Sequence, residues 1–345
     1  MTLDTTPAAQ KPHVFRFLSV AAIGALALTA CNGDNGDDAD NGGSEAAGEG
    51  TITIEDDHGS HEINLEEVES IGAFDNRTFR TLEDFDVELS VAARSLMQPH
   101  VHETYAEDED ILDTGNHREP NLEVLAAAEP DLVITGQRYS QYYEEMAGLM
   151  PEDGVILEFD EELTDPATFF DGLRNQVENL GIIFQSEDQA EELIAEFNEA
   201  ADRVAAAYNG EDTVMGLLTS GGDINYAGPQ EGRGVAPIFQ EFNLQPALEV
   251  EDQSSDHEGD DISVEAIANS NPDWIIVLDR DGMTPDDPEY TAADELIADS
   301  PALQETSAIE NDQIVYMPQN MYITEDIQAY TEFLNDFADA LEAAE

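Results

Sequence analysis

A short helical segment followed by an apolar run occurs twice in this chain, in the same order and at a constant spacing. Residues 123–138 (EVLAAAEPDLVITGQR) and residues 265–280 (EAIANSNPDWIIVLDR) align without a gap at an offset of 142. In each copy a short helical segment ends at a Pro-Asp pair, because proline lacks the amide N–H and restricts the residue before it. A continuous apolar run follows, which is typical of a strand buried on both faces of a parallel α/β sheet.

The pattern elsewhere predicts further strands and helices around the two repeats. Alternation at residues 51–63 predicts an edge hairpin that turns near residues 57–59, and residues 68–96 predict strand, helix and strand. Apolar residues at helical spacing predict a long helix over residues 165–184. The remaining helices are predicted at 139–149, 187–208, 235–242 and 325–343, and the remaining strands at 111–112, 154–159, 213–218 and 313–317.

Each repeat ends in an arginine, Arg138 in the first copy and Arg280 in the second. In open α/β sheets, ligands bind just beyond the carboxyl ends of the strands, and both arginines fall there. We therefore predict an α/β protein with two Rossmann-like lobes, residues 51–164 and 186–345, whose central sheets are mostly parallel. One long connecting helix, residues 165–185, joins them, and the two arginines face a shared site.

The first 30 residues have the pattern of a signal peptide. Lys11 and Arg16 precede the apolar stretch 17–30, which is too short to span a bilayer comfortably. The stretch ends in LTAC, which resembles a bacterial lipobox and implies cleavage before Cys31 and acylation of that residue, the single cysteine of the chain. Residues 31–50 carry almost no apolar side chains and are predicted to form a flexible acidic tether.

The strongly negative charge of the chain argues against two classes of anionic binding partner. With 79 acidic and 11 basic residues, the formal net charge is −68, and no lysine follows residue 11. Such a surface repels nucleic acid and anionic lipid headgroups, so we expect neither as a partner. The acid excess as a whole is typical of a solvated surface suited to a medium of high salt or alkaline pH.

The sequence contains few motifs of catalysis. It has no GxSxG, P-loop or HExxH motif, and its glycines at 228, 232 and 234 do not follow the dinucleotide-binding pattern. We therefore expect that the protein is not an enzyme and holds no intrinsic cofactor. Because basic residues are scarce, arginines at strand ends or in a glycine-rich loop are candidate ligand-binding residues. Three meet this description: Arg138, Arg233 and Arg280. Ordinary salt bridging is the alternative reading, but guanidinium groups are also the preferred cations for fixed contact with anionic oxygens.

Several motifs together resemble siderophore-type substrate-binding proteins of bacterial ABC importers, above all those for ferric catecholate or petrobactin-like ligands. The resemblance covers most of residues 64–343. The motifs that carry it are EPNLEVLAAAEPDLVITGQRYSQYYEEM (119–146), NYAGPQEGRG (225–234), SSDHEGDDIS (254–263), NPDWIIVLDR (271–280) and MPQNMYITED (317–326).

The resemblance implies a fold of the periplasmic-binding-protein type with a rigid hinge. It also implies that Arg138, Arg233 and Arg280 surround an anionic iron–catecholate centre, and that His257 and Tyr322 complete the coordination of Fe(III). The protein would be a monomer, anchored by lipid at Cys31 on the extracytoplasmic face of the membrane, that passes a ferric siderophore to a permease.

Three alternatives stay open at this stage. A receptor for bare Zn(II) or Mn(II) would use the histidines of the first half, His58, His61, His100, His102 and His117. A haem or cobalamin receptor is the second, although the arginines argue against neutral cobalamin. A cell-wall adhesion lipoprotein is the third, and the repeated α/β half argues against it.

A net charge of −68 repels a ferric tris-catecholate at long range, because that chelate is itself an anion. One arginine–anion contact at about 4 Å contributes roughly 4 kcal/mol at an effective dielectric constant near 20. In about 1 M salt the Debye length is only about 3 Å, so the acidic surface is screened while contacts inside a dehydrated site persist. We therefore expect the local arginines to outweigh the distant carboxylates.

Overall fold

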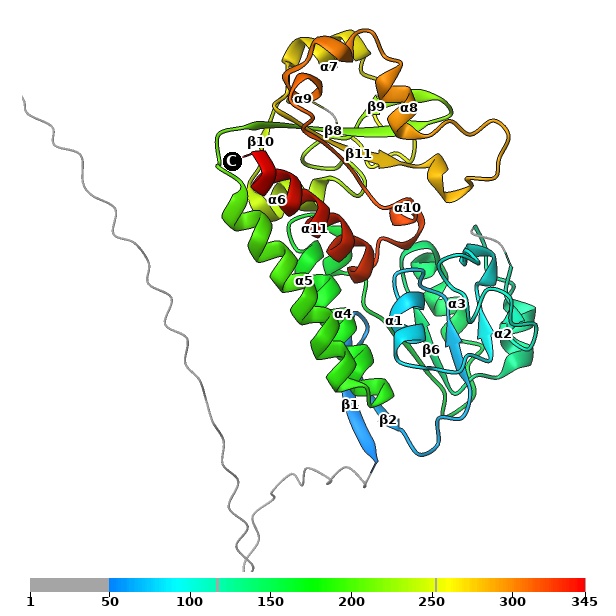
Figure 1. Cartoon of the computed structure of the whole chain (residues 1–345). Helices are drawn as coiled ribbons and strands as arrows, with labels where there is room; N and C mark the ends of the chain where they lie inside the picture. Colours follow the sequence, from blue (N-terminus) through cyan, green and yellow to red (C-terminus); the bar gives the residue numbers. More distant parts are fainter. Residues whose placement is uncertain (1–49, 116–117, 252, 345) are drawn as a thin grey trace, which may run out of the picture. The chain divides into compact units, whose positions relative to one another are not determined.

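The computed structural model describes residues 50–115, 118–251 and 253–344. The predicted signal peptide, Cys31 and the tether up to residue 49 lie outside the described residues, as does His117. Within the described part, two five-stranded sheets and a two-stranded hairpin are covered by helices (Figure 1). The α/β fold class with mostly parallel sheets is confirmed.

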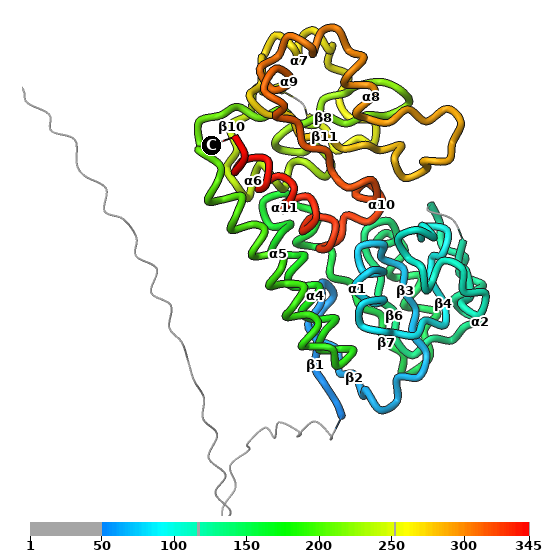
Figure 2. The backbone as a smooth tube through the Cα atoms, in the orientation of Figure 1, coloured from blue at the N-terminus to red at the C-terminus, as the bar shows by residue number. Residues whose placement is uncertain are grey.

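The first sheet is formed by five parallel strands in the order β5-β4-β3-β6-β7. Figure 2 traces the backbone through β3, β4, β6 and β7 of this sheet. Its strands are β3 (Ile71–Ala73), β4 (Val91–Ala92), β5 (Leu112–Asp113), β6 (Leu132–Thr135) and β7 (Val155–Glu158). All four residues of β6 are buried, as expected for the centre of a parallel sheet covered on both faces.

The second sheet has the order β10-β8-β11-β12, with β9 paired to β8. Its strands are β8 (Thr213–Ser220), β9 (Asp223–Tyr226), β10 (Gln245–Pro246), β11 (Trp274–Asp279) and β12 (Ile314–Tyr316). All pairs are parallel except β8 with β9, which form an antiparallel hairpin that the hydrophobic pattern does not predict. The carboxyl ends of β8, β11 and β12 therefore meet at one edge.

The predicted helices occur in the predicted order with differences at their ends, and the short helices at residues 293–298, 307–310 and 321–324 were not predicted. They are α1 (Phe79–Asp84), α2 (Leu122–Ala128), α3 (Tyr143–Ala147), α4 (Phe169–Phe184), α5 (Glu187–Ala207), α6 (Ala236–Phe242), α7 (Val264–Ser270), α8 (Ala293–Ala298), α9 (Ser307–Glu310), α10 (Met321–Thr324) and α11 (Ile327–Ala344). The predicted connecting helix is α4; α5 packs against it and α11 packs along α5 (Figure 1). The closing helix starts at Ile327 rather than at residue 325, because Glu325 adopts left-handed backbone angles that end α10.

The two repeats fold alike. The side chains of Asn121 and Ser263, at offset 142, cap α2 and α7 at equivalent places. Both helices end in a left-handed residue before the proline, as is common at helix C-termini. Asp131 then accepts hydrogen bonds from the backbone N–H and hydroxyl of Ser70, and Asp273 accepts the same pair from Thr213. Each repeated aspartate thus ties its own strand to the neighbouring one.

The predicted hairpin is formed by β1 (Thr51–Asp56) and β2 (Gly59–Asn64), but it is a separate two-stranded sheet and not the edge of a larger one. Its histidines are less free than the sequence suggests. His58 stacks on Tyr143 and its Nε2 lies 2.6 Å from Glu158, while His61 lies 2.9 Å from Asp56. The hairpin is thereby held against the end of β7.

Candidate functional site

Arg138 is placed by a sharp turn after β6. Gly136 approaches a buried carboxylate so closely that an added Cβ would lie 2.9 Å from Oδ2 of Asp75. The next residue, Gln137, has φ +43° and turns the chain into the 3-10 helix η2 (Gln137–Tyr142), which carries Arg138. The half-buried Arg138 makes no ion pair with any residue in the described ranges.

Arg280 comes directly after β11, at the start of the 3-10 helix η4 (Asp281–Met283). Its Nη1 donates to Oγ of Ser220 at 2.6 Å and lies 3.7 Å from a carboxylate oxygen of Asp281. Ser220 ends β8, the parallel neighbour of β11, so the adjacent carboxyl ends of two strands hold this guanidinium.

Arg233 comes from the loop between β9 and α6 and contacts Tyr322, a buried residue of α10. Its guanidinium carbon lies 4.2 Å from the centre of the Tyr322 ring, and Nη2 donates to the Tyr322 carbonyl at 3.3 Å. The Arg280 guanidinium lies 5.8 Å from the same ring. Two of the predicted arginines and the predicted tyrosine therefore form one group of contacts.

Electrostatic interactions place Arg138 near this group as well. Burial lowers the pKa of Arg138, and the positive charge of Arg233 lowers it further, while Glu325 and Tyr322 act in the opposite direction. Burial also acts to lower the pKa of Arg233, but the carboxylate of Glu325 outweighs it, so that pKa is raised. The structure thus brings Arg233 and Arg280 to Tyr322, and it links Arg138 to them through its neighbour Gln137, which shares Glu325 with Arg233. We call Arg138, Arg233, Arg280 and Tyr322 the arginine cluster.

Each guanidinium of the arginine cluster has unused hydrogen-bonding capacity. The Nε atoms of Arg138, Arg233 and Arg280 are buried and have no hydrogen-bond partner among the described residues. Buried polar atoms are normally paired, so each such atom calls for an explanation. A bound anion that accepts these N–H groups would supply one.

Two residues of the site were not predicted. Glu325 is 5% exposed, and its Oε2 accepts from Nη2 of Arg233 at 2.9 Å and from Nε2 of Gln137 at 2.6 Å. Burial acts to raise the pKa of Glu325, but Arg233, Arg77 and Arg138 together lower it, so the carboxyl group is ionised at neutral pH. Nothing in the sequence distinguishes Glu325 from the other acidic residues, and Gln137 is visible only through its place beside Arg138.

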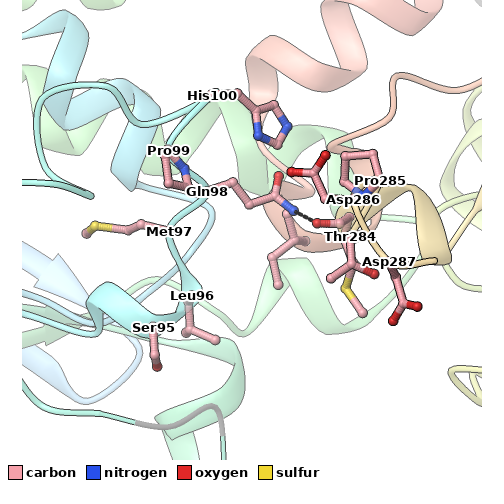
Figure 3. A pocket seen from close by; sticks show the side chains of 12 residues that line it. Ser95, Leu96, Met97, Gln98, Pro99, His100, Thr284, Pro285, Asp286 and Asp287 are labelled. Carbon is pink, nitrogen blue, oxygen red and sulfur yellow. Dashed lines mark hydrogen bonds between the residues drawn. The ribbon is translucent and has the colours of Figure 1, made fainter. Parts of the chain in front are cut away.

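A pocket of about 220 Å³ is lined among others by Arg77, Gln137, Arg233, Ser255 and Glu325, so that Arg233 is the one member of the arginine cluster among its lining residues. A larger pocket of about 410 Å³ lies between residues 95–100 and 283–287 (Figure 3). There Nε2 of Gln98 donates to the carbonyl of Met283 at 2.8 Å. Ile323, which follows Tyr322, completes the lining of this larger pocket.

The predicted histidine ligand does not join the cluster in this conformation. His257 is exposed in the loop before α7, its Nδ1 lies 3.7 Å from Asp256, and it is not among the residues that line the 220 Å³ pocket. Its role as an iron ligand stays a prediction, as does that of Tyr322.

The histidines of the alternative metal site do not form such a site within the described residues. His102 is 1% exposed, and its Nδ1 accepts from the backbone of Gln98, while burial lowers its pKa to about 4. His58 and His61 pair with carboxylates of the hairpin region, and His100 lines the pocket of Figure 3. In residues 50–115, 118–251 and 253–344 no group of three or more His, Cys, Asp or Glu side chains is arranged to hold a metal ion.

Two α/β sheets with arginines just beyond strands β6 and β11 are the arrangement expected of a solute-binding protein. Residues 71–321 match the family described as periplasmic binding protein, and the chain belongs to that family. The family is one of substrate-binding proteins rather than of enzymes. The described residues contain no helix of the length and hydropathy that a membrane crossing needs.

Relatives of known ligand agree with the resemblance drawn from the sequence. The chain is 22% identical to the petrobactin-binding protein YclQ of Bacillus subtilis, over 95% of this chain and 99% of that protein. It is 28% identical to the ferric-anguibactin-binding protein FatB of Vibrio anguillarum, over 74% of this chain and 76% of that one. The solved structure of BauB bound to ferric iron and two acinetobactin molecules shares the fold, with a TM-score of 0.70, 23% identity and coverage of 84% and 98%.

Proposed function

We propose that this protein captures a ferric siderophore of the anionic catecholate type outside the cytoplasm and delivers it to an ABC import permease. One observation supports the proposal most: Arg233 and Arg280 come from separate loops to the ring of Tyr322, and the buried Nε atoms of Arg138, Arg233 and Arg280 have no hydrogen-bond partner among the described residues. Guanidinium groups donate to anionic oxygens in fixed geometry, as recognition of catecholate oxygens requires.

The ligands named for the relatives support the same class of cargo, since petrobactin, anguibactin and acinetobactin are each bound as iron carriers. On this proposal the protein acts by binding and release without catalysis, and iron is cargo rather than a resident cofactor. The pocket of Figure 3 gives room for the part of the ligand beyond the chelate, because its lining residue Ile323 follows Tyr322 directly.

The proposal includes a lipid anchor and a division of the chain. Residues 1–30 would be removed as a signal peptide, Cys31 acylated, and residues 31–50 would tether the lobes 51–164 and 186–345, joined by 165–185. A monomer then docks on the permease. Cys31→Ser should move the protein from the detergent phase to the aqueous phase in a phase-partition assay, and an unchanged partition would remove the anchor.

Native mass spectrometry of the purified chain with a panel of iron chelates tests the cargo. The panel holds a synthetic ferric tris-catecholate, a ferric hydroxamate, haem, cobalamin and bare Zn(II) or Mn(II). We expect a stable one-to-one complex with the ferric catecholate and not with the bare ions. A chain that retains only Zn(II), haem or cobalamin would overturn the proposal.

A further inference from the structure

Glu325 holds a negative charge inside the group of residues that we assign to an anionic ligand. It follows the last residue of α10 with φ +45°, a left-handed conformation in which glycine or asparagine is usual. Such a backbone costs free energy for a residue with a Cβ, and so does burying a carboxylate. A neutral residue would avoid the second cost.

The contacts of Glu325 join separate elements of the site. One oxygen accepts from Gln137 of η2 and from Arg233 of the loop before α6. Because Arg233, Arg77 and Arg138 lower the pKa of Glu325 in spite of burial, its charge persists at neutral pH. The side chain of Gln could accept the same two hydrogen bonds, so the geometry alone does not require a charged residue here.

Counting charges shows what Glu325 does to the arginine cluster. The arginine cluster holds three guanidinium groups, two of them beside Tyr322, and Glu325 is a carboxylate at hydrogen-bond distance from Arg233. A ligand that takes the unpaired N–H groups of the cluster comes close to Glu325 and is repelled by it. This repulsion grows with each negative charge on the ligand, whereas loss of a purely structural contact affects all ligands equally.

We propose that Glu325 sets the charge class of the ligand, so that the site favours ferric chelates of lower negative charge over fully anionic tris-catecholates. This inference rests on the proposed function. Glu325 is a specificity-determining residue on this view: it offsets one arginine charge and leaves the cluster attractive to an anion, but less so to the most highly charged ones.

The test uses one synthetic tris-catecholamide chelator loaded with either gallium(III) or germanium(IV). The two complexes have nearly the same shape, but the gallium complex carries one more negative charge. Glu325→Gln keeps the size of the side chain and its acceptor oxygen while it removes the charge. Affinities of both complexes are measured by isothermal titration calorimetry for the wild type and the variant.

We expect Glu325→Gln to raise the preference for the gallium complex over the germanium complex by about tenfold. A tenfold change in preference is about 1.4 kcal/mol. That is the interaction energy of the Glu325 charge with the one extra ligand charge at about 8 Å and an effective dielectric constant of about 20 to 40. Equal factors for the two complexes would reduce Glu325 to a structural role and overturn the inference.

Glu332→Gln is the matched control. Glu332 also pairs with an arginine, at 2.6 Å from Arg80, but it is half exposed and lies on α11. Its loss removes one negative charge and one ion pair elsewhere in the molecule, so the preference between the two complexes should stay unchanged. A similar rise in the control would mean that overall net charge, and not Glu325, decides the preference, and would overturn the inference.

A folding defect in Glu325→Gln would not end the test. Glu325→Gly also removes the charge, and glycine fits the positive φ at this position, so that variant relieves backbone strain. The same rise in preference is expected of it, and an unchanged preference counts against the inference. Binding of neither complex by the folded wild type would instead refute the proposed function itself.

Discussion

Replacing Arg138 by glutamine should weaken ligand binding while it leaves the empty protein as stable as before, or more so. Arg138 has no ion pair among the described residues, its buried Nε has no hydrogen-bond partner, and burial together with Arg233 lowers its pKa. Its charge is therefore unfavourable in the empty site. A bound anion reverses the sign of that contribution.

The magnitudes follow from simple electrostatics. A guanidinium about 4 Å from a chelate oxygen contributes roughly 4 kcal/mol at a dielectric constant near 20, and glutamine retains part of this through a hydrogen bond. A loss of about 2–3 kcal/mol, or about 30- to 150-fold in Kd, is expected. Removal of a charge that burial disfavours and Arg233 repels should stabilise the empty protein by about 1 kcal/mol, which raises Tm by about 2 °C.

Quenching of the fluorescence of Trp274 and the tyrosines by a synthetic ferric tris-catecholate measures the affinity, and calorimetry of the empty protein measures Tm. Arg174→Gln is the control, because Arg174 pairs with Asp171 at 2.8 Å outside the cluster. It should change Kd little. Unchanged affinity in Arg138→Gln, or a fall in Tm of more than about 5 °C, would contradict the reasoning.

Three further outcomes are expected. Arg233→Gln leaves the buried Glu325 without its main cation, so it should lower the free energy of unfolding by about 3 kcal/mol as well as the affinity; an unchanged Tm would contradict this. Burial raises the pKa of Asp75 to about 6 from 3.8, so its contribution to stability is full below about pH 4 and is lost as the pH rises through about 6. Asp75→Asn should therefore lessen the fall in Tm between about pH 4.5 and pH 7.5, and parallel Tm curves for variant and wild type would argue against it. Raising NaCl from about 0.1 M to about 1 M should raise Tm, because salt screens the repulsion within a chain of net charge −68. Kd for the ferric chelate should rise by less than about tenfold, because contacts in a dehydrated site are screened little. Complete loss of binding would mean that the arginines are exposed to solvent.

The repeated part of the fold could be predicted because local rules decide it. Pro130 and Pro272 end their helices for a reason that lies within the chain itself, and the apolar runs after them are long enough to identify buried strands. The β8–β9 hairpin could not be predicted in this way. Gly221 and Gly222 supply its turn with positive φ, but β9 is short and only its last residue, Tyr226, is buried.

The sequence predicted the arginines of the candidate site but not its buried glutamate, Glu325. The nine arginines after residue 30 stand out among many acidic residues, and Arg138 and Arg280 are marked by their place after buried strands. Glu325 lies between α10, which the pattern does not predict, and α11, and it accepts hydrogen bonds from Gln137 and Arg233, both remote in sequence. Tertiary contacts of this kind leave no periodic trace.

The two repeats place their arginines at the same offset in the sequence but not at the same distance from the sheet. Arg138 is the third residue after the four-residue strand β6, whereas Arg280 directly follows the six-residue strand β11. A ligand with rotational symmetry therefore meets unlike surroundings on its two sides. Since ferric tris-catecholates form left- and right-handed propellers, the protein should bind one handedness more tightly, and circular dichroism of the bound complex would report which one.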